Sequence, residues 1–205
     1  MKVAVLGATG NVGSVIVGEA LDRGHQITGI SRHPDKAQPH AHLTAKQGDV
    51  LDTDGLAKLM AGHEAVISSV RFGTVTPMAQ KLFAALKQAG VKRFLVVGGA
   101  GSMEVKPGLQ LVDTPDFPPA YKNEALAGRE FLNIVRGEQE LEWTFLSPSA
   151  ELVPGQRTGK FRLGLDQLLV GSDGKSWISR QDFAVALIDE LEKPKHVCRR
   201  FTVGY

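Results

Sequence analysis

The stretch that decides the fold is Gly7-Ala8-Thr9-Gly10-Asn11-Val12-Gly13, in which glycine recurs at every third position. It follows an apolar run at 3–6 with the composition of a buried strand, and it leads into a helical pattern at 11–23. A turn of this kind lets the backbone approach a pyrophosphate and presents the unpaired amides of the helix start to it. The stretch therefore predicts a dinucleotide site, although such a turn can also be a plain connection.

The same alternation of strand and helix continues to about residue 150. We predict strands at 3–6, 26–30, 43–47, 65–68, 93–97 and 142–146, and helices at 11–23, 53–60, 76–89 and 120–137. Gly24 and Gly90 follow two of these helices, where glycine can take a positive φ and end the helix. The pattern predicts an α/β fold of the Rossmann type, doubly wound, with a mainly parallel sheet and helices on both faces.

The regular alternation of strand and helix patterns is lost in the later part of the chain. Residues 98–119 hold four glycines and four prolines, so we expect a long loop there that walls a pocket or is a tolerated surface insertion. Residues 148–178 are rich in glycine and are predicted to form a small C-terminal extension, a lobe on the substrate side. Ser179 to Asp182 matches a capping box before an amphipathic helix at 183–191, and 200–205 is expected to be a strand. No stretch divides the chain, so residues 1–205 are predicted to form one domain.

The amino-acid composition limits the classes of partner that the protein is expected to bind. The net charge of +2 comes from 24 basic and 22 acidic residues spread along the chain, which argues against nucleic acid and favours a small-molecule partner. No apolar run is long enough for a membrane span, and we expect a cytoplasmic protein, monomeric or homodimeric. The only cysteine, Cys198, excludes an internal disulfide and is interpreted as a packed strand residue. The histidines show no metal-ligand spacing, so no metal is expected.

The residues after the second strand indicate which dinucleotide is bound. An NAD-preferring site usually carries an acidic residue about 20 residues after the glycine turn. Ser31-Arg32 stand there instead, and a hydroxyl with a guanidinium can hold the 2′-phosphate of NADP(H). Arg32 could also be a solvated charge, or could stack on adenine, so NAD(H) remains possible. Asp49 is a candidate for the adenine amino group, or for capping its own loop.

The remaining predicted cofactor contacts come from the turn and from the carboxyl ends of the other strands. They are Gly7, Thr9, Gly10, Asn11, Val12, Gly13, Val50, Ser68, Ser69, Val70, Gly98, Gly99, Ser147 and Pro148.

These residues resemble a known family. The glycine turn, Ser31-Arg32 and Gly48-Asp49-Val50 resemble an atypical short-chain dehydrogenase. The segments at 147–150, 154–159, 178–184 and 200–203 resemble bacterial NADH-flavin reductases, which are similar to NmrA-like redox sensors and to flavin reductase/biliverdin-IXβ reductase. The likeness spans nearly the whole chain. It implies a Rossmann core, a reduced nicotinamide cofactor and a flavin, FMN or FAD, as hydride acceptor, while Arg32 argues for NADPH rather than NADH.

Short-chain dehydrogenases that reduce carbonyls use a tyrosine with a lysine four residues later. Tyr121 has Ala125 at that spacing, and its neighbour Lys122 points to another side of the helix. Tyr121 and Ser102 are the candidate catalytic residues. Tyr121 could equally be a surface residue and Ser102 a loop cap.

Two further residues are candidates for contact with the substrate. Phe72 could stack on a planar acceptor or pack in the core, and Arg157 could hold an anionic substrate group or be a solvated turn residue. The missing tyrosine–lysine pair favours flavin-type hydride transfer, in which charge is delocalised over the acceptor. The alternatives are a non-catalytic NADP(H)-sensing regulator of NmrA-like type and a nucleotide-sugar epimerase or dehydratase, which this short chain and the missing pair disfavour.

Overall fold

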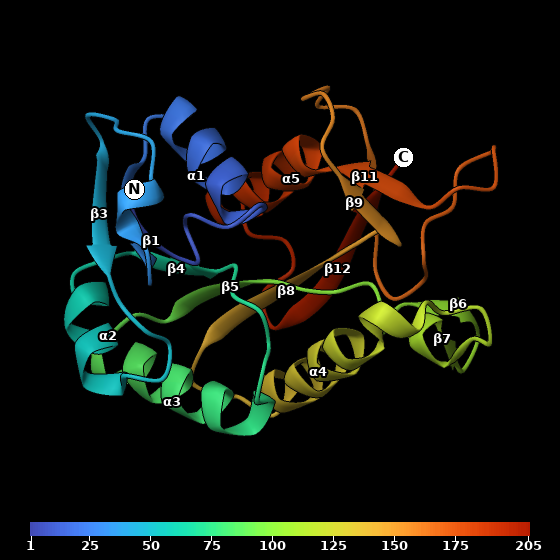
Figure 1. Cartoon of the computed structure of the whole chain (residues 1–205), viewed down its shortest axis with the longest axis horizontal. Coiled ribbons are helices and arrows are strands. Elements are labelled where there is room, and N and C mark those ends of the chain that lie inside the picture. The colour runs from blue at the N-terminus through green and yellow to red at the C-terminus, as the bar shows by residue number, and fades with distance from the viewer.

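The computed structural model describes residues 1–205 and is built on one eight-stranded sheet of order β10-β12-β8-β5-β4-β1-β2-β3 (Figure 1). All neighbouring strands in it are parallel except β10, which runs antiparallel to β12. The chain moves outward from β1 in both directions, so the strand order reverses between β1 and β4. The strands of this sheet are β1 (Lys2–Leu6), β2 (Gln26–Ser31), β3 (Leu43–Gln47), β4 (Ala65–Ser68), β5 (Arg93–Val97), β8 (Glu142–Pro148), β10 (Arg162–Gly164) and β12 (Arg199–Gly204).

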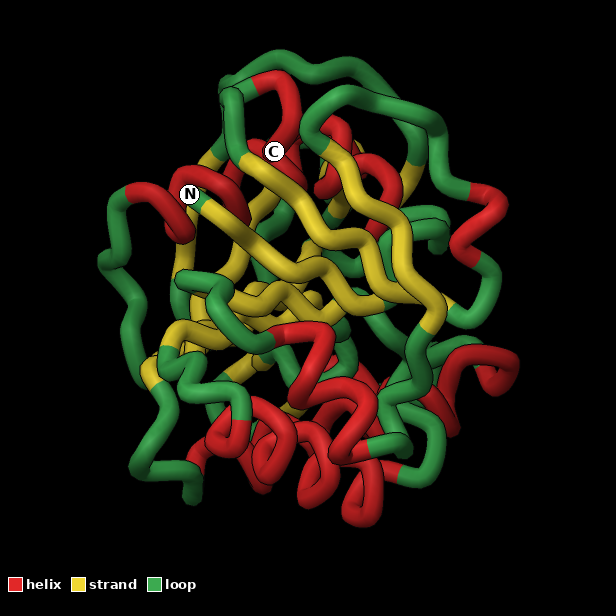
Figure 2. The backbone as a smooth tube through the Cα atoms, turned by 90° about the vertical axis from the view of Figure 1, so that its left-hand side faces the viewer, coloured by secondary structure: helices red, strands yellow, loops and turns green.

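Helices cover both faces of the sheet and bury a separate apolar core on each (Figure 2). On one face lie α1 (Gly13–Asp22) and α5 (Arg180–Glu192); on the other lie α2 (Thr53–Met60), α3 (Val75–Gln88) and α4 (Pro119–Arg136). Because both faces are covered, the central strands are apolar on both sides rather than alternating, as in β4, where every residue is buried. The predicted fold class is confirmed.

The predicted strands and helices before residue 150 are all present, with small shifts at their ends. Gly24 and Gly90 have φ values of 79° and 73°, as expected of glycines that end helices. Ser179 caps α5, because its hydroxyl accepts a hydrogen bond from the Asp182 amide at 3.0 Å. The local signals at helix ends were therefore interpreted correctly.

Three expectations about the later chain are wrong. Residues 98–119 contain a hairpin, β6 (Glu104–Lys106) and β7 (Leu109–Gln110), followed by the short helix η2 (Leu111–Asp113). Helix α5 is not amphipathic, since α1 and β11 (Trp177–Ser179) cover it and it is buried along nearly its whole length. Cys198 is exposed in the turn before β12 with a φ of 54°, so it is not a packed strand residue.

Residues 148–178 lie beside β12. They form β9 (Glu151–Val153), which pairs in parallel with β11, and β10, which extends the main sheet. A short helix, η1 (Pro34–Lys36), follows β2. No helix of the protein combines the length and the hydropathy needed to span a membrane.

Candidate nucleotide-binding cleft

A cleft of about 530 Å³ lies at the carboxyl ends of β1, β2 and β4, where the strand order reverses. This is the position at which doubly wound sheets bind their ligands. Its wall includes Gly7, Thr9 and Gly10 of the glycine turn, the end of β2 and the loops after β3 and β4. The lining residues are Leu6, Gly7, Thr9, Gly10, Ile30, Ser31, Arg32, His33, Lys36, Gly48, Asp49, Val50, Leu51, Leu56, Ser69, Val70, Arg71, Phe72, Gly73, Thr74 and Met78.

The glycine turn at the base of the cleft has no room for side chains. Gly7 has a φ of 76°, and a Cβ there would lie 2.5 Å from the Ser69 carbonyl oxygen. A Cβ on Gly13 would lie 2.1 Å from the Gly7 carbonyl oxygen. These overlaps are with backbone, which cannot move aside cheaply, so glycine is required at both positions.

The turn also leaves backbone donors unpaired. Helix α1 starts at Gly13 after Val12, a residue that cannot cap with its side chain. The amides of Asn11, Val12 and Gly13 donate to no acceptor within the protein. Unpaired amides at a helix start bind phosphate, so these residues fit the pyrophosphate of a dinucleotide.

At the end of β2 the cleft is polar and basic. Ser31 is only 7% exposed, and its hydroxyl has no hydrogen-bond partner in the protein. Arg32, His33 and Lys36 line the cleft beside it, while Asp35 does not. A buried hydroxyl next to guanidinium and ammonium groups can receive a phosphate ester. Sequence reasoning missed Lys36; Pro34 was the available signal, because the short turn that it starts brings Lys36 back to the cleft.

Asp49 is the only carboxylate in the lining of the cleft. Its Oδ1 accepts the Leu51 amide at 2.9 Å, whereas its Oδ2 has no protein partner. The cap of α2 is a different residue, Asp52, which accepts the Gly55 amide at 3.1 Å. One oxygen of Asp49 thus shapes the loop, and the other is available for a ligand.

The remaining predicted cofactor contacts lie outside the lining of the cleft, as do Asn11, Val12 and Gly13 of the turn. Gly98 and Gly99 follow β5, and a Cβ on Gly98 would lie 2.1 Å from the Phe145 ring. Ser147 and Pro148 are buried in β8, and the Ser147 hydroxyl has no partner. These residues, with the buried Ser68, stay predicted contacts for the nicotinamide half of the cofactor.

Phe72 borders the cleft with its backbone, but its ring lies in the core. The residue is 6% exposed, and its ring centroid lies 5.2 Å from that of Phe131 and 6.4 Å from that of Phe145. Gly128 on α4 makes room for the ring. The Glu124 carboxylate also accepts the Phe72 amide at 2.9 Å, so the structure favours the alternative that Phe72 packs in the core, and contact of Phe72 with an acceptor stays a prediction.

The tyrosine–lysine pair of carbonyl-reducing short-chain dehydrogenases is missing at positions 121 and 125. Tyr121 is 67% exposed on the first turn of α4 and makes no side-chain hydrogen bond within the protein. Ala125 packs against Gly101, where a Cβ would lie 2.7 Å from the Ala125 Cβ. The position four residues after Tyr121 is thus occupied by a small residue in contact with Gly101, and the catalytic lysine is missing.

Ser102 is not brought to the cleft. It is buried, and both its carbonyl oxygen and its hydroxyl accept hydrogen bonds from Arg200 Nη1 at 3.0 Å. It lines a different cavity, which shares no lining residue with the cleft. The structure therefore gives no support to Ser102 as a catalytic residue.

The side chain of Arg157 is paired with a carboxylate of the protein itself. Its Nε and Nη2 donate to the two oxygens of Glu19 at 2.6 and 2.8 Å, and Glu19 also accepts from Arg23 at 2.7 Å. The hydrogen bond from Arg157 is the main cause that lowers the pKa of Glu19, and it outweighs the opposing effect of burial. Because Nε and Nη2 of Arg157 are occupied by Glu19, the structure gives no support to the predicted role of Arg157 in holding an anionic substrate group.

Comparison with known proteins agrees with the geometry of the cleft. Residues 7–194 match the model of a family described as NAD(P)H-binding. The chain belongs to this NAD(P)H-binding family.

Solved structures of similar proteins carry different names. A Bacteroides thetaiotaomicron protein assigned as an epimerase is 43% identical, with a TM-score of 0.95 and coverage of 100% of this chain and 96% of that one. A Streptococcus pneumoniae protein assigned as an NADH-flavin reductase is 36% identical, with a TM-score of 0.86 over 100% and 99% of the chains. A Burkholderia pseudomallei protein assigned as exported is 43% identical, with a TM-score of 0.91 over 100% of both. The shared fold is that of an NAD(P)-binding oxidoreductase.

Proposed function

We propose that this protein transfers hydride from NADPH to a flavin or a similar planar acceptor. The observation that carries the reaction type is that Tyr121 lacks a lysine partner, because position 125 is an alanine that packs against Gly101. A ketone acceptor would need a proton donor for its developing alkoxide, whereas a flavin spreads the charge of the transferred hydride over its rings. The site is thus better suited to a delocalised acceptor than to a ketone.

The choice of NADPH over NADH rests on the end of β2. The unpartnered Ser31 hydroxyl, Arg32 and Lys36 supply donors and positive charge, and the one carboxylate in the lining, Asp49, comes from the loop after β3 rather than from the end of β2. A 2′-phosphate would gain charge-assisted hydrogen bonds there, while a free 2′-hydroxyl would find no acceptor of the usual kind. NADH is expected to bind more weakly, with Arg32 on the adenine face.

Each of the other cleft residues has a distinct role in this proposal. The amides of Asn11, Val12 and Gly13 hold the pyrophosphate, and Asp49 Oδ2 accepts from the adenine amino group. The bound cofactor supplies the hydride. The chain positions the reactive end of the cofactor beyond β4, towards the carboxyl ends of β5 and β8, and exact positioning supplies most of the rate in the absence of a dedicated acid.

The names of similar proteins differ in how well they support hydride transfer to a flavin. The Streptococcus pneumoniae relative carries the name of the proposed reaction class with NADH as donor. The Bacteroides thetaiotaomicron relative is assigned as an epimerase. We disfavour an epimerase or dehydratase role here because Tyr121 is exposed and lacks its lysine.

We further propose that residues 1–205 act as one domain, with residues 148–178 bordering the acceptor. Small molecules are the expected partners, because basic and acidic residues nearly balance in the sequence. A cytoplasmic location and a monomeric or homodimeric state belong to the same proposal.

The test is anaerobic oxidation of NADPH, followed by absorbance, with FMN, FAD, riboflavin and a quinone offered separately. We expect turnover with at least one of these planar acceptors and a lower kcat/KM with NADH. Binding of NADP⁺ and NADPH with equal affinity and no turnover would contradict the proposal and favour a regulator that senses NADP(H). Turnover of a nucleotide sugar alone would favour the epimerase alternative.

A further inference from the structure

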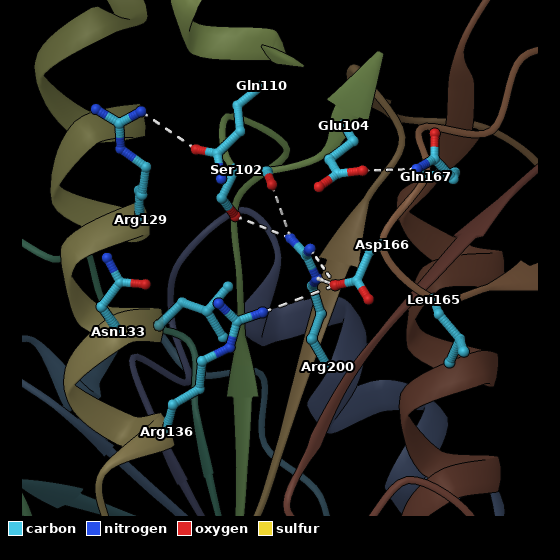
Figure 3. A pocket seen from close by; sticks show the side chains of 11 residues that line it. Ser102, Glu104, Gln110, Arg129, Asn133, Arg136, Leu165, Asp166, Gln167 and Arg200 are labelled. Carbon is cyan, nitrogen blue, oxygen red and sulfur yellow. Dashed lines mark hydrogen bonds and ion pairs between the residues drawn. The ribbon is translucent and has the colours of Figure 1, made fainter. Parts of the chain in front are cut away.

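A second cavity lies between α4, the β6–β7 hairpin, the loop after β10 and the strand β12 (Figure 3). Its volume is about 490 Å³, within the usual range for small-molecule sites. Only Leu132 and Leu165 are apolar in its lining, and the other residues are Ser102, Glu104, Gln110, Arg129, Asn133, Arg136, Asp166, Gln167 and Arg200. Because it has no lining residue in common with the nucleotide cleft, this cavity is separate from the proposed site of hydride transfer.

The walls of the cavity are held in place by the protein. Arg200, whose side chain is only 4% exposed, donates to the Ser102 carbonyl and hydroxyl on one side and to Asp166 on the other. The Glu104 amide donates to the Asp166 carbonyl at 2.9 Å, and the Leu168 amide donates to the Glu104 carbonyl at 2.8 Å. The hairpin and the loop after β10 are thus joined by backbone hydrogen bonds, so the cavity is formed before any ligand arrives.

The wall supplied by α4 presents donors that the protein leaves largely unused. Arg129, Asn133 and Arg136 follow at helical spacing on one side of α4, and Figure 3 shows them facing the cavity. The Asn133 amide has no partner, and Arg136 reaches only Asp166, at 3.7 Å, too far for a hydrogen bond. Arg129 uses Nη1 on Gln110 and Asp113, which leaves its Nε and Nη2 unpaired.

The lining itself holds one more positive than negative group, and Asp113, which lies outside the lining, pairs with Arg129 at 2.8 Å. The lining has the three guanidinium groups of Arg129, Arg136 and Arg200 against the two carboxylates of Glu104 and Asp166. Glu104 is partly satisfied by Gln167, which donates to it at 2.7 Å, and Asp166 is turned towards Arg200. The excess of fixed donors over acceptors therefore lies along α4.

We propose that this cavity binds a small hydrophilic oxyanion, a carboxylate or a phosphate ester, between Arg129 and Arg136. Guanidinium groups bind these anions through paired N–H donors, and the Asn133 amide adds a neutral donor between the two arginines. Apart from Leu132 and Leu165 the lining is polar and offers little apolar surface for a flavin ring, so the ligand belongs to a different class from the proposed hydride acceptor. The proposal does not depend on the identity of the cofactor.

Inorganic phosphate and citrate are suitable probes, titrated separately and followed by ¹H–¹⁵N NMR of the side-chain amides. We expect saturable shifts of Asn133, Gln110 and Gln167 with at least one probe. Arg136→Gln should weaken that binding about tenfold through loss of one charge-assisted interaction. Lys122→Gln removes the same charge from an exposed position of α4 outside the cavity and should leave the dissociation constant unchanged.

Phosphate can also reach the pyrophosphate site of the cleft, but its shifts would then appear at residues 9–13 and would be displaced by NADP⁺. Arg129→Gln provides a second variant if Arg136→Gln alters the fold. Cavity amides that do not shift with either probe would overturn the proposal. So would an equal loss of binding in Arg136→Gln and Lys122→Gln, which would indicate general charge rather than a site.

Discussion

The nucleotide cleft and the C-terminal junction differ in how their polar groups are satisfied. By C-terminal junction we mean Glu19, Arg157, Thr158, Asp182 and Tyr205, where the turn after β9 meets α1, α5 and the chain end. In the cleft, the Ser31 hydroxyl and the amides that start α1 have no partners. In the junction, by contrast, Asp182 accepts from the Thr158 and Gly159 amides, both at 2.8 Å, and from the hydroxyls of Thr158 and Tyr205 at 2.5 and 2.6 Å.

This difference separates groups that await a ligand from groups that hold the framework. Buried polar groups in native proteins are nearly always paired, so those left unpaired in a cleft point to something that binds there. A saturated network, by contrast, fixes one arrangement of the chain. On this criterion we propose different functions for Arg32, which lines the cleft, and for Arg157, which pairs with Glu19.

The largest expected effect is on the junction. Asp182→Ala should lower the free energy of unfolding by about 3 kcal/mol, because it removes the buried carboxylate that accepts four hydrogen bonds. Urea unfolding followed by circular dichroism measures this change. Asp35→Ala, an exposed acid without hydrogen bonds, is the matched control, and a loss no larger than in that control would show that the junction does not hold the fold.

The second-largest expected effect is on the affinity of the nucleotide cleft for its cofactor. Arg32→Glu should weaken NADPH binding roughly a hundredfold, because it removes a charge-assisted hydrogen bond and sets a negative charge against the 2′-phosphate. NADH binding should fall much less, and stability should not change. Calorimetric titration of both cofactors measures the difference. An equal loss for NADH and NADPH would mean that Arg32 does not contact the 2′-phosphate.

Acid should weaken the junction in a defined pH range. Burial raises the pKa of Asp182, but the hydrogen bonds from Thr158, Tyr205 and Gly159 outweigh it and hold the pKa below the ordinary value of 3.8. The stability that the carboxylate contributes is thus complete above that value and is lost as the pH falls from 3.8 through the folded pKa.

Asp182→Asn isolates this contribution from that of other carboxylates. The unfolding free energy of the natural protein should fall more steeply than that of the variant below pH 3.8, and the two should run parallel above it. Urea unfolding at a series of pH values measures both slopes. Parallel curves throughout would show that the Asp182 pKa is the same in the folded and unfolded chain.

The sequence predicts those parts of the molecule that depend on local patterns. Gly7 and Gly13 are recognised because the tight turn has room only for glycine. Ser31 and Arg32 are recognised because they follow a predicted strand, whose end lies at the cleft. Ser179 is found as a helix cap from an equally local pattern. Such signals lie within a few residues of each other, so they can be interpreted without knowledge of the tertiary structure.

Contacts between distant segments could not be predicted in this way. Arg157 meets Glu19 across 138 positions of the chain, and nothing near Arg157 in sequence distinguishes it from a substrate-binding arginine. Phe72 is drawn into the core by Phe131 and Phe145, and Ser102 is paired with Arg200 on a late strand. Each of these side chains was assigned to a ligand because its partner in the protein could not be seen.

Arg157→Gln tests that reassignment. The variant should keep its KM for cofactor and acceptor, because Arg157 contacts only Glu19, and it should unfold at slightly lower temperature. Differential scanning calorimetry and steady-state kinetics measure the two effects. A raised KM for the acceptor at unchanged stability would restore Arg157 to the substrate site.

The smallest expected effect is that of Tyr121→Phe. The hydroxyl of Tyr121 is exposed and unbonded, and Ala125 stands where a carbonyl reductase carries its lysine. The variant should therefore reduce a planar acceptor at the rate of the natural protein, with the same pH profile of kcat. A fall in kcat without a change in KM would instead identify the hydroxyl as a proton donor in the transition state. The reaction would then resemble carbonyl reduction. The contrast between the unpaired polar groups of the cleft and the fully paired groups of the C-terminal junction would then apply only to the part of the site that binds the cofactor.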